Sequence, residues 1–236
     1  MPGQTFTTTE QPTPGSSETL ETTPVLVVGA EPTGLLLAYL LSKLGIESIV
    51  IEKYPERLGA PKDHALSPRS LEICRQFGLD TIAIRKLGTP RTDAYWVNFV
   101  TNLSGDQVGR LPYERMGPAT LKANPEMIHN IPQPVFEQYL TDQLSGDPRV
   151  ELRTGIAFIT CTQDSGGVVI VWVCSTYSIL SYRPWLLSRK VAKQYNIANV
   201  LLAGDAAHSF PPTAGLGLNS GIADVHNIAY TIAAVQ

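Results

Sequence analysis

The chain has 236 residues, enough for one α/β domain of ordinary size and a small appendage. Only 17% of the residues are charged and the net charge is −3, so the composition gives no electrostatic case for binding nucleic acid. The three cysteines have no metal-binding spacing and leave one unpaired in any disulfide scheme, and the four histidines add no metal motif. We therefore expect no metal site, and the cysteine usage favours a reduced, cytoplasmic setting.

Residues 1–23 are rich in Thr, Ser, Pro and Glu and have few large apolar side chains. Such a segment cannot bury enough apolar surface to offset the entropy of ordering, so we expect a disordered tail. The sequence has no Lys or Arg before Lys43, which argues against a signal or transit peptide, and the apolar run Leu35–Leu41 is too short to span a bilayer. Residues 24–236 are expected to form the folded domain, with no membrane span.

The first folded element is predicted to be a βαβ unit. The short apolar run Val25–Val28 is typical of a parallel strand buried on both faces, and leucines at helical spacing follow it. A second strand over residues 46–51 ends at Glu52. Two glycines in the first turn, Gly29 and Gly34, and an acid about twenty residues later match the dinucleotide-binding arrangement.

Two features of this unit bear on ligand binding. Glu52 can accept hydrogen bonds from both hydroxyls of an adenosine ribose, and Lys53 follows it; an exposed glutamate without a ligand is the alternative. The turn departs from the G-x-G-x-x-G pattern because Glu31 replaces the middle glycine, which adds bulk and negative charge where a pyrophosphate would lie. We therefore expect weak dinucleotide binding unless the Glu31 side chain turns outward.

The middle of the chain contains helix and strand signals in alternation. The elements predicted there are a helix that starts at Ser67-Pro68, a hairpin from residues 95–100 and 107–111, a helix after the Pro-rich loop at 131–134, a strand over 150–153, and a second hairpin from residues 156–161 and 168–174.

The segment Asn199–Gly221 is the most specific motif of the chain. It begins with an apolar run, Val200–Ala203, that is predicted to be a buried strand, and Gly204 with Asp205 then opens a turn. Ligand-binding loops of α/β sheets follow the carboxyl ends of the strands, so the Asp205 carboxylate can accept sugar hydroxyls there. A helix is predicted over residues 222–234, and its first N–H groups favour an anionic or electron-rich ligand atom. The residues that lead into it are Gly215, Gly217, Leu218 and Asn219.

This segment, together with the string Gly59–Glu72, resembles the FAD-dependent aromatic hydroxylases, the class of p-hydroxybenzoate and phenol hydroxylases. The resemblance implies an α/β fold: an FAD/NAD(P)-binding Rossmann-like domain of the glutathione-reductase type, with residues 95–111 and 156–174 as a reduced β-rich piece on the substrate side. It also implies FAD as cofactor, NAD(P)H as reductant, and a small aromatic substrate, phenolic or polyketide, in secondary metabolism. The cofactor-binding residues that it implies are Gly29, Gly34, Glu52, Lys53, Arg69, Gln133, Gly204, Asp205, Gly215, Gly217, Leu218 and Asn219.

The sequence also departs from this family. The relatives carry an Asp-Gly strand and most of a substrate sheet where this chain passes from Val173 to Asn199, and no Asp-Gly dipeptide occurs in it. A flavin monooxygenase is therefore one interpretation. The other interpretations are a degenerate FAD-fold binding module without turnover, half of a complementing pair, and a gene model that lacks a coding segment. No catalytic residue is assigned, because His208 fits a capping or packing role as well, and a homo-oligomer stays open.

Overall fold

The computed structural model describes residues 21–56, 63–165, 167–174, 189–211 and 215–235. Most of the predicted tail, residues 1–20, lies outside the described residues, so its disorder stays a prediction. The last part of that segment lies against the domain: the Glu21 carboxylate accepts hydrogen bonds of 2.6 and 2.7 Å from the Arg153 guanidinium.

The core of the domain is a three-stranded parallel sheet in the order β1-β2-β7. Its strands are β1 (Val25–Val28), β2 (Ser48–Glu52) and β7 (Val150–Thr154), close to the three strands predicted from the sequence. Val27 lies opposite Val50, which in turn lies opposite Leu152, so one row of aliphatic side chains crosses the sheet. The helix α1 (Pro32–Lys43) connects β1 to β2, which confirms the predicted βαβ unit.

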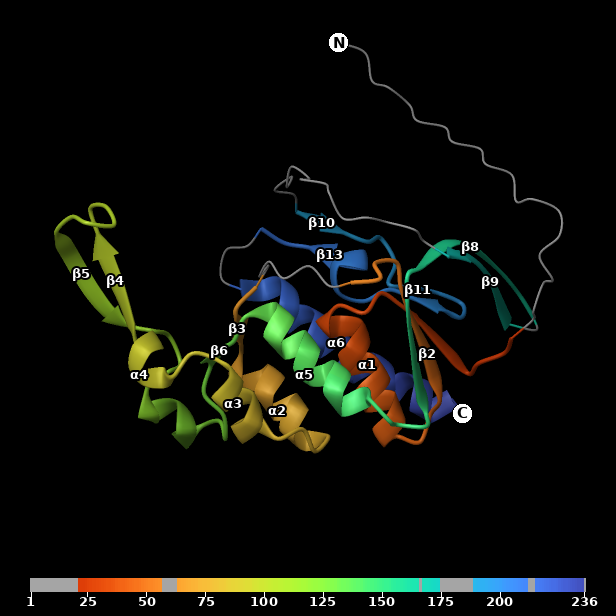
Figure 1. Cartoon of the computed structure of the whole chain (residues 1–236), viewed down its shortest axis with the longest axis horizontal. Helices are drawn as coiled ribbons and strands as arrows, with labels where there is room; N and C mark the ends of the chain where they lie inside the picture. Colours follow the sequence, from red (N-terminus) through yellow and green to blue (C-terminus); the bar gives the residue numbers. More distant parts are fainter. Residues whose placement is uncertain (1–20, 57–62, 166, 175–188, 212–214, 236) are drawn as a thin grey trace, which may run out of the picture.

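Three helices form the layer that covers this sheet (Figure 1). Helix α1 packs against β1, β2 and β7, and both α5 (Gln133–Leu144) and α6 (Leu216–Val235) pack against α1. The α1 leucines Leu35, Leu36, Leu40 and Leu41 are fully buried in this arrangement. No helix of the described ranges has the length and apolarity to cross a membrane.

The remaining helices are short. They are α2 (Pro68–Gln76), α3 (Thr81–Leu87), α4 (Arg91–Ala94) and the 3-10 turns η1 (Pro118–Lys122) and η2 (Gly204–Ala206). Helix α2 begins as predicted, because Ser67 caps it by accepting a hydrogen bond from the N–H of Ser70 at 3.1 Å.

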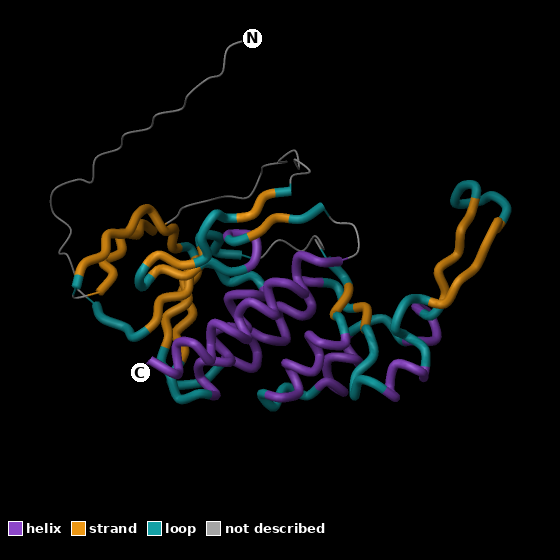
Figure 2. Tube along the Cα trace, turned by 180° about the vertical axis from the view of Figure 1, so that it is seen from behind, coloured by secondary structure: helices purple, strands orange, loops and turns teal. Residues whose placement is uncertain are grey.

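Both predicted hairpins form, but they do not join into one β-rich piece. The first consists of β4 (Trp96–Val100) and β5 (Gln107–Pro112), the second of β8 (Ile156–Asp164) and β9 (Gly167–Cys174). Each is a separate two-stranded sheet, and they lie at opposite ends of the molecule (Figures 1 and 2). That the two hairpins are the remnant of a substrate-side sheet stays a prediction, and no described strand links them.

The strand expected over residues 200–203 is also corrected. Only Val200–Leu201 is a strand, β12, and it pairs antiparallel with β11 (Asn196–Ile197) rather than joining the parallel sheet. Ala198, at φ +47°, lies in the two-residue turn between them. Pairing with a strand so close in the sequence costs little loop-closure entropy, which explains why β12 pairs with β11. In the described sheet β1 is consequently an edge strand.

Two further pairs of short strands form in the described chain. Strand β3 (Ala65–Leu66) pairs with β6 (His129–Asn130), and β10 (Lys190–Val191) pairs with β13 (His208–Ser209). Both are antiparallel ladders of two residues each. The first brings residues 63–70 beside the start of α5, since Ile131 and Gln133 donate their N–H groups to His64 and Asp63.

Burial of His129 makes the stability of the fold depend on pH. Burial, together with the nearby positive charge of Arg85, lowers its pKa from 6.5 to about 4. The unfolded chain then binds the proton more readily than the folded chain does. The contribution of the neutral ring is complete above pH 6.5 and is lost as the pH falls towards 4.

We therefore expect the free energy of unfolding to decrease by up to about 1.4 kcal/mol for each pH unit as the pH falls from 6.5 towards 4. Replacing His129 with Gln should flatten that slope, which urea unfolding at several pH values measures. His64→Gln removes an exposed histidine instead and serves as the control. Equal slopes for wild type and His129→Gln would contradict the expectation.

Candidate functional site

The turn between β1 and α1 has the close-packed backbone of a dinucleotide-binding turn. Gly29 has φ +104°, and its N–H donates to the carbonyl of Ile51 at 2.8 Å. A Cβ on Gly34 would overlap the carbonyl oxygen of Gly29, so only glycine fits there. Both glycines predicted for this turn therefore have a structural cause. The N-terminus of α1, with Pro32 in its first turn, opens beside them.

The Glu52 side chain closes this turn from the neighbouring strand. One carboxylate oxygen accepts the N–H of Ala30 at 2.9 Å and the other accepts the N–H of Tyr54 at 3.0 Å. Each oxygen keeps a further lone pair, so ribose hydroxyls can still donate to it. Lys53 is exposed and places its ammonium 4.6 Å from the centre of the Tyr54 ring. The ribose assignment of Glu52 stays a prediction that the geometry supports.

Glu31 lies at the mouth of the turn, directly before α1. It is exposed and has extended backbone, with φ −71° and ψ 173°, and its side chain does not cap the helix. This backbone conformation is open to any residue, so glycine is not needed for the fold of the turn. A side chain here therefore matters for what can approach the backbone, rather than for the turn itself.

The Gly-Asp turn meets the start of α1, although the two segments are far apart in sequence. Gly204 is buried at φ +56°, and a Cβ there would come within 3.0 Å of the Thr33 hydroxyl oxygen. On α6, a Cβ on Gly221 would overlap the same hydroxyl. The start of α1, η2 and α6 thus touch through one threonine and two glycines. Asp205, exposed in η2, is brought beside the N-terminus of α1 by these contacts.

Asn219 joins the first turn of α6 to the segment at 65–70. Its amide nitrogen donates to the carbonyls of Ala65 at 2.9 Å and Gly215 at 2.7 Å. Its amide oxygen accepts the N–H of Ser67 at 2.8 Å and the hydroxyl of Ser70 at 2.6 Å. All the hydrogen-bonding capacity of the amide is therefore used by the protein, and Asn219 acts as a fixed corner of the site rather than as a free ligand group.

Helix α6 begins at Leu216, earlier than the predicted residue 222. Gly217 and Leu218 consequently lie within the helix, and the Leu218 side chain is buried in the core. Gly215, which precedes the helix, has φ +57°. A role for these residues along a flavin ring stays a prediction, and for Leu218 only the backbone can fulfil it.

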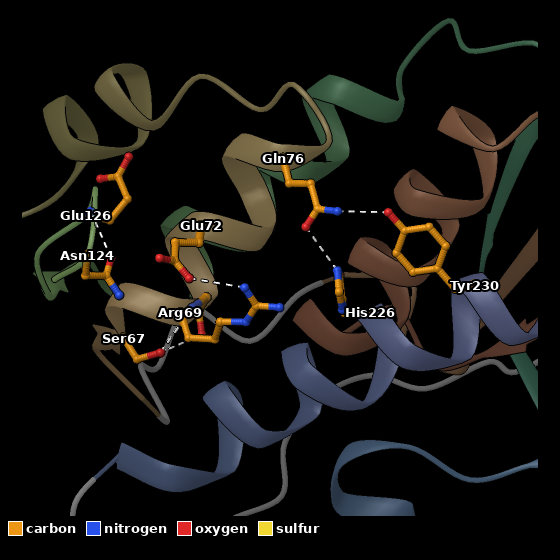
Figure 3. Close-up of polar contacts among 9 residues, drawn as sticks. Ser67, Arg69, Glu72, Gln76, Asn124, Glu126, His226 and Tyr230 are labelled. Atoms are coloured by element: carbon orange, nitrogen blue, oxygen red, sulfur yellow. Dashed lines mark hydrogen bonds and ion pairs between the residues drawn. The ribbon is translucent and has the colours of Figure 1, made fainter.

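Arg69 and Gln133, two of the predicted cofactor contacts, form their hydrogen bonds and ion pairs with residues outside the Gly-Asp turn. The Arg69 guanidinium is exposed on α2 and pairs with Glu72 at 3.1 Å, beside the face where Gln76 bonds to Tyr230 and His226 (Figure 3). Burial lowers the pKa of His226, and the charge of Arg69 lowers it further. Arg69 thus belongs to the contact between α2 and α6, and the described geometry gives it no bond to the Gly-Asp turn.

Gln133 lies closer to the motif residues. Its N–H donates to the carbonyl of Asp63, whose carboxylate is 3.7 Å from the place of a Cβ on Gly215. The buried Gln133 side chain donates through its amide nitrogen to Glu137 at 2.7 Å. The amide oxygen and the second hydrogen of the amide nitrogen are therefore what it can still offer to a ligand.

Sequence reasoning missed one residue of the site, Asp224. Its carboxylate accepts the N–H of Gly204 at 3.0 Å and lies 2.7 Å from His208 Nε2. It is also the only Asp, Glu, Lys or Arg between Leu216 and Val235. A single charged residue in an otherwise uncharged helix is the feature of the sequence that could have identified it. The described part of the chain has no cluster of His, Cys, Asp and Glu that could hold a metal ion.

A sequence model of the FAD binding domain family matches residues 22–176 and 169–236. The two matches together cover nearly the whole chain, which therefore belongs to this FAD-binding family. They meet at residues 169–176, near the place where the sequence departs from the aromatic hydroxylases.

Individual relatives and one solved structure are monooxygenases. Phenol 2-monooxygenase of Pseudomonas sp. strain EST1001 is 27% identical over 203 residues, which are 84% of this chain and 30% of that protein. Tetracenomycin A2 monooxygenase-dioxygenase of Streptomyces glaucescens is 51% identical over 53 residues, 22% of this chain and 9% of that protein. The flavin-dependent monooxygenase PieE, solved with FAD and substrate, has a TM-score of 0.79 at 20% identity, over 90% of this chain and 58% of that one.

The chain spans under a third of the length of these two sequence relatives. The likeness to PieE shows the fold. The residues that are present fit FAD, because Gly29 and Gly34 leave the turn backbone open and Asp205 lies beside the N-terminus of α1. Glu31 is the residue of the turn that is expected to oppose the fit.

Proposed function

We propose that the protein is an FAD-dependent monooxygenase that hydroxylates a small aromatic compound, phenolic or polyketide, with NAD(P)H and O₂. The observation that carries the proposal is the contact of the Gly-Asp turn with the start of α1 through Thr33, Gly204 and Gly221. This contact supports the proposal because it brings Asp205, the carboxylate proposed to bind the ribityl chain, close to the N-terminus of α1, which is proposed to bind the pyrophosphate. The relatives include a phenol monooxygenase, a tetracenomycin monooxygenase and a putative polyketide hydroxylase, which supports the reaction class and a place in secondary metabolism.

The residues of the site have distinct tasks in this proposal. FAD, when bound, supplies the redox chemistry by accepting a hydride from NAD(P)H and activating O₂ for transfer to an electron-rich ring. Glu52 holds the adenosine ribose, and the N-terminus of α1 with the glycines of its turn faces the pyrophosphate. Asp205 holds the ribityl chain. No side chain is assigned to proton transfer, so the protein's part is to bind and orient.

The cellular setting follows the same reasoning. We place the protein in the cytoplasm, because its three cysteines are unpaired. The exposed apolar side chains of both hairpins, among them Phe99, Leu111 and Val171, support a homo-oligomer or a complementing subunit.

Replacing Asp205 with Ala tests the assignment of the site. We expect FAD binding to weaken by about ten- to a hundredfold, since a lost hydrogen bond to a charged acceptor is worth roughly 1.5–3 kcal/mol. Titration of the protein with FAD, followed by flavin fluorescence, measures the dissociation constants. Asp106→Ala, in the β4–β5 turn, removes another exposed carboxylate far from the site and should bind like wild type. If both variants bind FAD equally well, Asp205 does not contact the cofactor.

A further inference from the structure

The single charge of α6 faces the Gly-Asp turn rather than solvent. The Asp224 side chain is 22% exposed, and one of its oxygens, Oδ2, both accepts the N–H of Gly204 at 3.0 Å and contacts His208 Nε2 at 2.7 Å. These two partners lie on either side of Asp205 in the sequence. One carboxylate oxygen therefore holds the chain at the start of η2 and again just after it.

His208 is the second partner, and its ring is enclosed. It is 5% exposed and lies 5.0 Å from the Phe210 ring and 6.2 Å from the Tyr195 ring, measured between centroids. Because a carboxylate can only accept, Nε2 carries the hydrogen of this bond. Nδ1 is buried without a hydrogen-bond partner among the described residues. The bond to Asp224 thus accounts for the orientation of the ring.

The segment between the two anchors is short and internally closed. Ala207 donates its N–H to the carbonyl of Gly204 at 2.9 Å, which completes η2. His208 begins β13, where it pairs with Val191 of β10. Gly204 and His208 therefore hold the chain on both sides of Asp205, and both are bonded to the Asp224 carboxylate.

We propose that Asp224 is a positioning residue, which orients the Asp205 carboxylate towards the ribityl half of FAD by holding Gly204 and His208. The inference rests on the proposed function, because it concerns how the same site binds its cofactor. Asp224 acts through the turn and touches neither FAD nor substrate. It follows that the residue matters for the flavin half of the ligand and not for the adenosine diphosphate half, which the turn of α1 and Glu52 would hold.

The test compares FAD with ADP as ligands, using calorimetric titration of wild type, Asp224→Ala and Asp224→Asn. We expect Asp224→Ala to weaken FAD binding by at least about tenfold and to leave ADP binding unchanged. Asp224→Asn should stay within about threefold of wild type for both ligands, because the amide oxygen can accept both hydrogen bonds. Asn227→Ala, an exposed position on the same helix, is the control and should match wild type.

Each outcome decides the inference. Equal weakening of FAD and ADP by Asp224→Ala would show a general loss of fold, and unchanged FAD binding would show that the turn keeps its shape without Asp224; either overturns it. If Asp224→Ala does not fold, His208→Phe removes the second anchor alone and must give the same FAD-selective weakening. A wild-type protein that binds ADP but not FAD would overturn the proposed function as well, which separates the two failures.

Discussion

Replacing Glu31 with glycine is expected to tighten FAD binding by about ten- to a thousandfold. Glu31 directly precedes α1, at the place where the backbone of a dinucleotide-binding turn approaches the pyrophosphate. Two like charges 4 Å apart repel by about 1 kcal/mol in water and by about 4 kcal/mol at an effective dielectric of 20. The Cβ of Glu31 adds bulk to this repulsion. The backbone of residue 31 is ordinary, so glycine can adopt it without rearranging the turn.

Three further variants separate the causes. Glu31→Gln keeps the volume and removes the charge, so it should recover the electrostatic part of the gain. Glu31→Ala also removes the side chain beyond Cβ, so its difference from Glu31→Gly measures the effect of the Cβ alone. Glu47→Gln removes the same charge just before β2, at the opposite end of the parallel strands, and should leave affinity unchanged. Fluorescence titration with FAD measures all four. Equal affinities for wild type and Glu31→Gly would mean that the Glu31 side chain points away from the pyrophosphate.

The parts of the fold that the sequence predicts well are those fixed by local signals. The apolar run Val25–Val28, the turn glycines and the acid at Glu52 specify a βαβ unit, and the structure confirms that unit. Ser67 caps α2 as its residue type indicates, and both hairpins form around their turns. Each of these depends on contacts within about thirty residues, where pattern and turn chemistry decide the outcome.

The predictions that the structure corrects concern places where contacts between neighbouring residues compete with contacts between residues far apart in the sequence. The run at 200–203 has the composition of a buried strand, yet only two of its residues pair, with the neighbouring β11. The early start of α6 at Leu216 is fixed by Asn219 bonding to Ala65 and Ser67, a tertiary contact that periodicity does not report. Asp224 was overlooked for the same reason, since its partners become visible only when η2 lies against α6.

The described chain offers the site little shelter from water. Asp205 is exposed, and the β4–β5 hairpin stands away from the helices rather than over the Gly-Asp turn (Figure 2). A cavity of about 300 Å³ is lined by side chains of α3 and α5 and by none of the predicted cofactor-binding residues. Excluding water protects reactive intermediates in oxygen chemistry from side reactions. A site this open should use its reductant inefficiently.

We therefore expect hydrogen peroxide to be the larger product when the isolated chain oxidises NAD(P)H in the presence of FAD, O₂ and a phenol, with hydroxylated phenol the smaller one. One assay that measures NAD(P)H consumed, peroxide formed and phenol hydroxylated determines this ratio. Asp205→Ala with the same FAD concentration is the control for reaction by unbound flavin, because it should lose the hydroxylated product first. Hydroxylation equal to NAD(P)H consumption would show that the site closes over its substrate, against the exposure seen here. Peroxide without any hydroxylated product, for polyketide as for simple phenols, would leave an FAD-binding oxidase activity and overturn the proposed monooxygenase.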